Sequence, residues 1–163
     1  MRARGRVIAG IDPGTQVAGF ARVVAPPAGV RGPASVVEAR ALDLGSGTRP
    51  IRLGSLAVEV ERWLLATRPR VVVVELAHVG PHPGAGLAVA EARGVILGVC
   101  GLLDVAVAQY RPAEIKQAIT GRGNAAKPAV RAELVARHGL DPELPLDASD
   151  ALALALTHAL RLG

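Results

Sequence analysis

Four acidic residues stand where folding could bring their carboxylates together. Asp12 ends an apolar run typical of a buried strand, and Glu75 ends a β-branched run of the same kind. Asp147 and Asp150 are three residues apart at the start of a helical pattern, which places their side chains on one face about 5 to 6 Å apart. Clustered carboxylates repel one another unless a cation lies among them. Because oxygen ligands without a cysteine cluster suit hard cations, the pattern predicts a site for Mg²⁺ or Mn²⁺.

Each of these acids also has an ordinary structural interpretation. Asp12 precedes Pro-Gly and is a common turn residue. Glu75 could be a solvent-exposed strand end, and either Asp147 or Asp150 could cap the last helix. Two acids at the ends of buried strands, together with an Asp pair in a net-basic chain, favour the metal site over these separate interpretations.

A second group of residues is basic and rich in glycine. Segments 110–117 and 121–127 contain Lys116 and Lys127, the only two lysines in the chain. Two glycines in the second segment would let backbone amides approach a phosphate. We interpret the group as a patch that faces phosphate; the alternative is a solvated pair of helices that carries two ordinary lysines.

The hydrophobic pattern predicts the elements that must position these residues. Strands are expected at 6–12, 17–24, about 35–43, 70–75 and 104–110, and helices at 50–67, 87–103, 112–119, 126–138 and about 147–161. The first three strands suggest an antiparallel meander, and the later ones alternate with helices, which predicts a mixed five-stranded α/β sheet with helices on both faces. Ligands bind beyond the carboxyl ends of parallel strands in such sheets. Asp12 and Glu75 therefore meet at one edge if their strands are parallel neighbours.

Length and composition restrict the class of protein. The chain has 163 residues, half of them hydrophobic, so we expect one domain that spans residues 1–163. Its net charge of +5, from 19 basic and 14 acidic side chains, favours a polyanionic partner such as nucleic acid. Phe20, Trp63 and Tyr110 are the only aromatic residues, too few for the stacking platform of an RRM-like or OB-like single-strand binder.

The sequence predicts neither a membrane span nor a signal peptide. The longest apolar stretch, 94–103, has about half of the roughly 20 residues that a bilayer span needs. The basic amino end runs into a strand pattern without a small-residue cleavage site. We therefore expect a soluble, cytoplasmic protein with no membrane partner. Cys100 lies in an apolar helical run and is expected to be a core residue.

Five motifs occur in order along the chain and together point to a known family. They are Gly10-Ile-Asp-Pro-Gly14, Val73-Val-Glu75, Ala92-Arg-Gly94, Ile115-Lys-Gln117 with the segment from Gly121 to Lys127, and the stretch from Asp147 to His158. This ordered set, from about Val7 to Arg161, resembles the Holliday-junction resolvases of the RuvC type. The resemblance implies an RNase H-like fold, a homodimer, and a Mg²⁺-dependent endonuclease that nicks two opposing strands of a four-way DNA junction.

The resemblance also implies roles for individual residues. The catalytic carboxylates that bind metal would be Asp12, Glu75, Asp147 and Asp150, while Lys116 and Lys127 would act near the scissile phosphate. Under this hypothesis two Mg²⁺ ions, or Mn²⁺ in their place, lie about 3.5 to 4 Å apart and Asp12 bridges them. The residues expected to contact DNA are His78, Arg93, Arg111, Lys116, Arg122 and Lys127.

One segment departs from the family. After the strand-ending Glu the family usually has Gln and then an aromatic residue that inserts at the junction centre, whereas here Leu76-Ala-His78 follows. His78 could stack in place of that wedge, or the enzyme could cut a different branched DNA. We interpret His78 and His82 as solvent-exposed rather than as metal ligands. His158 lies about 11 to 12 Å along the helix axis from Asp150, so a packing or capping role is expected.

Two symmetric cuts need two active sites, which is why a homodimer is expected. The small-residue helix 87–103 is the candidate interface, although packing on the sheet would explain its composition nearly as well. The resemblance points further to a branch-migration complex of the RuvA-RuvB type as a partner. The alternatives are a non-catalytic junction-binding protein and an RNase H-like nuclease that acts on another branched DNA.

Overall fold

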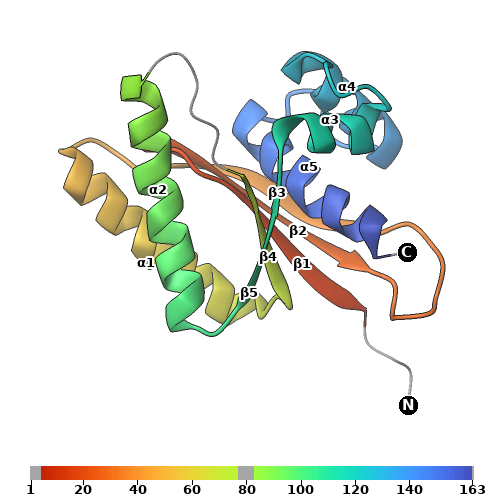
Figure 1. Ribbon diagram of the computed structural model, residues 1–163, viewed down its shortest axis with the longest axis horizontal. Helices are drawn as coiled ribbons and strands as arrows, with labels where there is room; N and C mark the ends of the chain where they lie inside the picture. Colours follow the sequence, from red (N-terminus) through yellow and green to blue (C-terminus); the bar gives the residue numbers. More distant parts are fainter. Residues whose placement is uncertain (1–4, 77–82, 163) are drawn as a thin grey trace.

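The computed structural model describes residues 5–76 and 83–162 of the chain, drawn in Figure 1. His78 and His82, which the sequence analysis considered for DNA stacking and metal binding, lie outside these residues. The strands are β1 (Arg6–Asp12), β2 (Val17–Ala25), β3 (Ser35–Asp43), β4 (Val71–Glu75) and β5 (Ala106–Tyr110). The helices are α1 (Arg49–Thr67), α2 (Pro83–Leu102), α3 (Pro112–Thr120), α4 (Lys127–His138) and α5 (Leu146–Arg161).

The strands form one mixed sheet in the order β3-β2-β1-β4-β5. Strands β1, β2 and β3 make the expected antiparallel meander, with Asp12 opposite Gly19. Strand β4 pairs in parallel with both β1 and β5. Because β1 and β4 are parallel neighbours, Asp12 and Glu75 lie at the same edge of the sheet, as the sequence analysis required.

Helices cover both faces of the sheet, with α1 and α2 on one face and α3, α4 and α5 on the other (Figure 1). The buried side chains of β1 alternate between the two cores: Ile8 packs towards α5, while Ala9 and Ile11 pack with α1 and α2. Strand β4 is buried on both faces, at Val72 and Val74 on one side and Val73 on the other. This double burial explains its uninterrupted β-branched sequence.

Helix α5 lies across the sheet in the interior of the protein. Every residue from Ala148 to Thr157 is buried except Asp150. The helix backbone approaches the sheet at Gly10 and Gly19, where an added Cβ would overlap the carbonyl oxygens of Ala151 and Asp147. These two glycines therefore bring the first turns of α5 against the ends of β1 and β2, beside Asp12.

Two predicted element bounds differ from the structure by two residues or more, and the others by at most one. Helix α2 begins at Pro83, four residues before the predicted start at Leu87, because proline is well suited to a first helical turn and the Pro/Gly segment had been assigned to a loop. Strand β5 begins at Ala106 and not at Asp104, since Asp104 has φ 53°, a left-handed conformation that a strand does not contain. In the part of the chain described here, the helices are all too short or too polar to cross a membrane.

The close approach of α5 predicts a large effect for Gly10→Ala. The added methyl group would meet the backbone of α5, which cannot move aside without opening the core. We expect the free energy of unfolding to fall by about 1 to 3 kcal/mol or more, as measured by urea denaturation. Gly54→Ala is the matched control, because its Cβ would meet open space on α1 and should stabilise the helix by roughly 0.5 to 1 kcal/mol. Equal effects of the two substitutions would contradict this account.

Candidate active site

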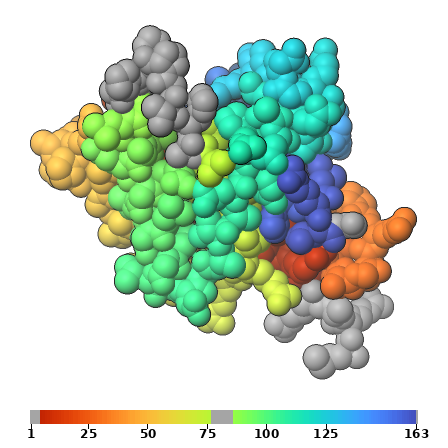
Figure 2. Space-filling model, in the orientation of Figure 1, coloured from red at the N-terminus to blue at the C-terminus, as the bar shows by residue number. Residues whose placement is uncertain are grey.

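The acids at the ends of β1 and β4 open into one cavity of about 330 Å³. Asp12, Glu75 and Asp150 line it together with Lys116 and Lys127, and its apolar wall includes Ile115, Val130 and Leu154. These residues come from two strands and from α3, α4 and α5, which are far apart in the sequence. In the space-filling view of Figure 2, α2 and the α3–α4 region stand on either side of the end of β4. The cavity therefore combines carboxylates with both lysines of the chain.

Burial and neighbouring negative charge both act on Asp12. Its partial burial, followed by the charges of Asp150, Asp147 and Glu75, raises the pKa of the Asp12 carboxyl from 3.8 to about 7, although Lys127 acts in the opposite direction. The other three predicted acids thus lie within electrostatic reach of Asp12. Asp147 belongs to this neighbourhood through its charge and is not part of the cavity wall.

Lys127 supplies positive charge to these acids. It is the first residue of α4, and its ammonium group forms an ion pair with the carboxylate of Asp150. Burial disfavours the charge on Lys127, but the hydrogen bond and charge of Asp150, with the charges of Asp12 and Glu75, raise its pKa above the ordinary value. The ion pair joins the predicted phosphate-facing patch to the predicted metal site, which the sequence analysis had treated as separate groups.

The donor types fit a hard divalent cation, but the side chains are not gathered around one point. Among the described residues, no three acidic, histidine or cysteine side chains come close enough together to hold a metal ion. Asp150 is directed to Lys127 in this arrangement. Burial and the charges of the other acids together outweigh the opposing effect of Lys127 on the Asp12 carboxyl, whose pKa is raised. A bound cation would favour the ionised form of Asp12.

The structure tests the ordinary structural interpretations of Asp147, Asp150 and Glu75. The N-cap residue of α5 is Pro145 and makes no side-chain cap hydrogen bond, so neither Asp147 nor Asp150 is the N-cap. Asp150 is the one ionisable residue inside an otherwise buried run of α5, a position where charged residues are rare unless they are paired. Glu75 is half-buried and not fully exposed at its strand end.

The other predicted site residues differ in their exposure and in the contacts that they make. Arg111 and Arg122 are exposed, at the N-cap of α3 and in the turn that follows this helix. Arg93 on α2 is half-buried, and its guanidinium binds the backbone carbonyl of Glu75. His158 hydrogen-bonds the Tyr110 hydroxyl through Nδ1 at 2.7 Å, in keeping with the packing role expected for it.

Sequence reasoning missed three residues that position the site. Gly10 and Gly19 allow the close approach of α5, and glycine inside a strand is a recognisable signal for such an approach. Arg52 on α1 donates from Nε to the carbonyl of Thr15 at 2.6 Å and so holds the turn that follows Asp12. No sequence signal distinguishes Arg52 from the other arginines, because its partner is a backbone oxygen.

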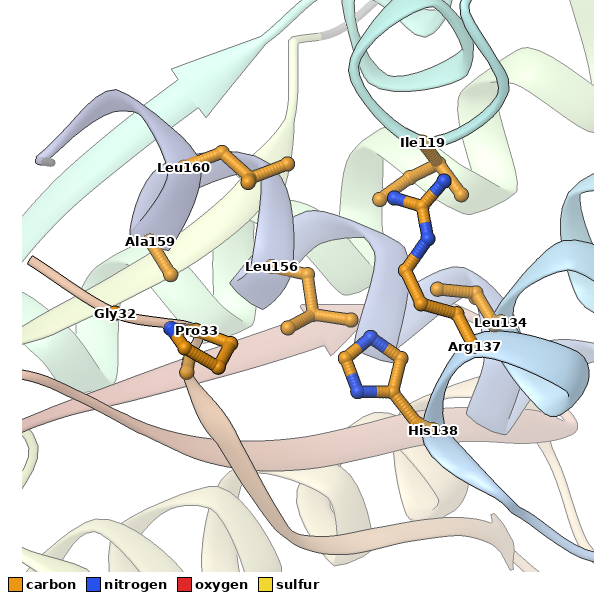
Figure 3. Close-up of a pocket in the computed structure, with 10 residues that line it drawn as sticks. Gly32, Pro33, Ile119, Leu134, Arg137, His138, Leu156, Ala159 and Leu160 are labelled. Carbon is orange, nitrogen blue, oxygen red and sulfur yellow. The ribbon is translucent and has the colours of Figure 1, made fainter.

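A second cavity, of about 180 Å³, lies between α4, α5 and the connection from β2 to β3 (Figure 3). Leu134, Leu156 and Leu160 provide much of its apolar wall, while Arg137 and His138 are the ionisable residues that line it. It shares no lining residue with the acidic cavity and none of its lining residues is acidic. The carboxylate chemistry therefore belongs to the first cavity.

Comparison with known proteins identifies relatives along nearly the whole chain. Residues 8–158 match the family model described as crossover junction endodeoxyribonuclease RuvC. The RuvC protein of Thiobacillus denitrificans is 37% identical over 153 residues, which cover 93% of this chain and 86% of that protein. The RuvC protein of Alkalilimnicola ehrlichii is 36% identical, with coverage of 93% and 89%.

Solved structures give the same result for the fold. A structure of Thermus thermophilus RuvC matches with a TM-score of 0.79 and 31% identity, and covers 94% of this chain and 93% of that one. RuvC from the same organism in complex with a Holliday junction substrate matches with a TM-score of 0.82 and 32% identity, with coverage of 96% and 94%. The sheet and helices described above are therefore those of an RNase H-like fold.

The raised pKa of Asp12 predicts how the stability of the metal-free protein depends on pH. The folded state holds this proton up to about pH 7, whereas the unfolded chain releases it near 3.8, so stability should fall as pH rises between these values. Asp12→Asn removes the carboxylate and should stabilise the metal-free protein at pH 8 by roughly 1 to 4 kcal/mol. Urea denaturation in EDTA at pH 5 and pH 8 measures both effects.

The control for this experiment is Glu61→Gln, which removes an exposed acid from α1 and so changes the net charge by the same amount. We expect Glu61→Gln to keep the pH dependence of the wild-type protein. If Asp12→Asn keeps it as well, Asp12 does not carry the buried charge that we assign to it.

Proposed function

The chain belongs to the RuvC family of crossover junction endodeoxyribonucleases, and from this premise we propose that Asp12, Glu75, Asp147 and Asp150 form the active site with which it resolves Holliday junctions. The observation that carries this proposal is the shared cavity, in which the acids that end β1 and β4 face Asp150 of α5 and both lysines. Carboxylates and ammonium groups that converge on one opening suit a phosphodiester substrate, whose charge needs cations and whose hydrolysis needs an activated water.

We propose Mg²⁺ as the cofactor, with two ions per active site and Mn²⁺ as a substitute. When bound, the ions supply positive charge to the attacking and leaving oxygens of the phosphodiester. Asp12 is the central ligand in this proposal, because it is the acid on which the charges of the other three converge. Glu75, Asp147 and Asp150 complete the ligand set from a strand end and from the first two turns of α5.

Lys116 and Lys127 act on the phosphate in this proposal. Both line the cavity, and a positive charge held in place before the reaction stabilises the charge that develops on the phosphate oxygens. The ion pair with Asp150 keeps Lys127 at the cavity, because an unpaired lysine at the start of α4 would extend into solvent. Lys127 would thus serve both as a counterion of the acids and as a contact for the substrate.

Branched DNA is the proposed substrate, in line with the Holliday junction bound to the Thermus thermophilus protein. Arg111 and Arg122 are exposed at either end of α3, the helix that carries Lys116, and we propose that they contact the DNA backbone. The family's aromatic wedge has no counterpart here, because the sequence contains no aromatic residue between Trp63 and Tyr110; Leu76, which follows Glu75, is 37% exposed. This difference favours a test on several branched substrates and not on the four-way junction alone.

A homodimer formed through α2 is also proposed. One side of this helix is buried in the core at Ala92, Ile96 and Cys100. An added Cβ at Gly94, Gly98 or Gly101 would meet no other atom within 4 Å, so packing within the protomer does not require glycine at these three positions. Leu87 and Leu102 on the same helix are 58% and 86% exposed. A second copy of the chain would cover this apolar, small-residue side; a RuvA-RuvB-type complex remains a prediction of the sequence.

The proposed activity predicts paired nicks in a four-way junction that require a divalent metal. The protein should be incubated with a junction, a fork, a linear duplex and an RNA–DNA hybrid, each in Mg²⁺ and in EDTA. Asp12→Asn should lower cleavage at least about 10³-fold, as loss of a catalytic group does in other hydrolases. Its junction affinity, measured without metal, should equal or exceed that of the wild type because a negative charge has left the site.

Each other result of this experiment has a definite meaning. Cleavage of the fork but not of the junction would establish a different branched substrate. Tight junction binding without nicks in any metal would favour a non-catalytic junction-binding protein. Full activity of Asp12→Asn would remove Asp12 from the active site.

The proposed dimer predicts the effect of a charge on the exposed side of α2. Gly98→Glu should leave the protomer folded, because its side chain would extend into open space, but it should break the contact between two copies. Sedimentation equilibrium at micromolar protein should give a dimer for the wild type and a monomer for the variant. Gly54→Glu on the exposed side of α1 is the control and should remain dimeric. A wild-type monomer at these concentrations would contradict the proposal.

A further inference from the structure

Arg93 connects α2 to the ends of two strands. Its Nε donates to the backbone carbonyl of Glu75 at 3.2 Å, and its Nη2 donates to the side-chain oxygen of Gln109. Glu75 is the last residue of β4, and Gln109 is the last but one of β5. One guanidinium group therefore spans the ends of both parallel strands on the face of the sheet that α2 covers.

The hydrogen bonds of the sheet end unevenly around Glu75. On the β5 side, pairing continues to Glu75 opposite Tyr110, and the amide of Leu76 donates to the Tyr110 carbonyl at 2.8 Å. On the other side, the pairing of β4 with β1 runs only to Val73 opposite Gly10. Arg93 adds a side-chain hydrogen bond at a point of β4 that lies beyond its pairing with β1.

The backbone at Glu75 sets the direction in which its carboxylate leaves the strand. Because β4 ends at this residue, that direction depends on what holds the last peptide group in place. Arginine suits this task, since its planar group is always charged and carries five donors in a rigid fork. A lysine in the same place would present one compact ammonium group and could not reproduce both contacts with the same geometry.

We propose that Arg93 is a positioning residue, which holds the end of β4 so that the Glu75 carboxylate faces Asp12 and Asp150. This inference rests on the proposed function, in which Glu75 is one of the four metal-binding carboxylates. It differs from the role in DNA contact that the sequence suggested for Arg93. The side chain is half-buried, and two of its nitrogens already donate to groups of the protein.

The test compares Arg93→Met, which keeps the length of the side chain but has no donor, with Arg93→Lys and Gln109→Ala. For Arg93→Met, junction affinity in EDTA should stay within about twofold of wild type, with an unchanged dependence on salt. Mn²⁺ affinity, measured by calorimetric titration without DNA, should fall about 10- to 100-fold, as should cleavage at saturating junction. Arg93→Lys should recover only part of both losses. Gln109→Ala should also lower the Mn²⁺ affinity and the cleavage rate, but by a smaller factor.

Arg122→Met is the matched control for a phosphate contact. Loss of one such contact should weaken junction binding and lower the slope of log affinity against log salt by about 0.9. If Arg93→Met behaves in this way while keeping its Mn²⁺ affinity, Arg93 is a DNA contact and the inference is wrong. Wild-type values for both Mn²⁺ binding and cleavage in Arg93→Met would overturn it as well.

Two further controls keep the result interpretable. Thermal unfolding establishes that each variant is folded, and if Arg93→Met is not, Arg93→Lys and Gln109→Ala decide by the same criteria. A wild-type protein that cleaves no substrate in any metal would overturn the proposed function. Wild-type cleavage together with an unaffected Arg93→Met variant would overturn only the role of Arg93.

Discussion

Burial of Asp12, together with repulsion among the acids at the ends of β1 and β4 and at the start of α5, is the electrostatic cost that the rest of the protein must offset. Burial and the charges of Asp150, Asp147 and Glu75 disfavour the ionised form of Asp12, and its raised pKa reports that cost. The opposing contribution comes from α5, whose run from Ala148 to Thr157 is buried except for Asp150. Burial of this apolar helix against the sheet stabilises an arrangement that the charges alone would push apart.

The same repulsion explains why a cation belongs to the chemistry of the site. Lys127 is an internal cation that pairs with Asp150, but Asp12 still has a pKa far above that of an ordinary aspartate. A cation bound beside Asp12 would favour its ionised form against both burial and repulsion. In the proposed reaction that charge is supplied by divalent metal, and the same charge then holds the scissile phosphate.

Some basic residues of the chain contact groups of the protein itself, and we propose that others face the substrate. Ion pairs within the protein involve many of the arginines, namely Arg22, Arg40, Arg49, Arg62, Arg137 and Arg161. Arg52 and Arg93 instead donate to backbone carbonyls beside the acids. The net charge of +5 is therefore a coarse guide to DNA binding. We attribute the phosphate-facing surface to the smaller group that lies around the cavity and α3.

Local patterns in the sequence determined most of the elements and the family of the protein. Buried and exposed positions alternate with the period of each element, so strands β1 to β5 and the helices could be predicted, and Asp12 and Glu75 could be recognised as strand ends. The start of α2 was wrong because Pro83 suits both a loop and a first helical turn. Only the tertiary structure decided that β1 lies beside β4, that Gly10 and Gly19 admit α5, and that Lys127 and Arg93 find their partners. Those contacts join residues far apart in the chain, and they depend on how all the elements pack together, which no local pattern contains.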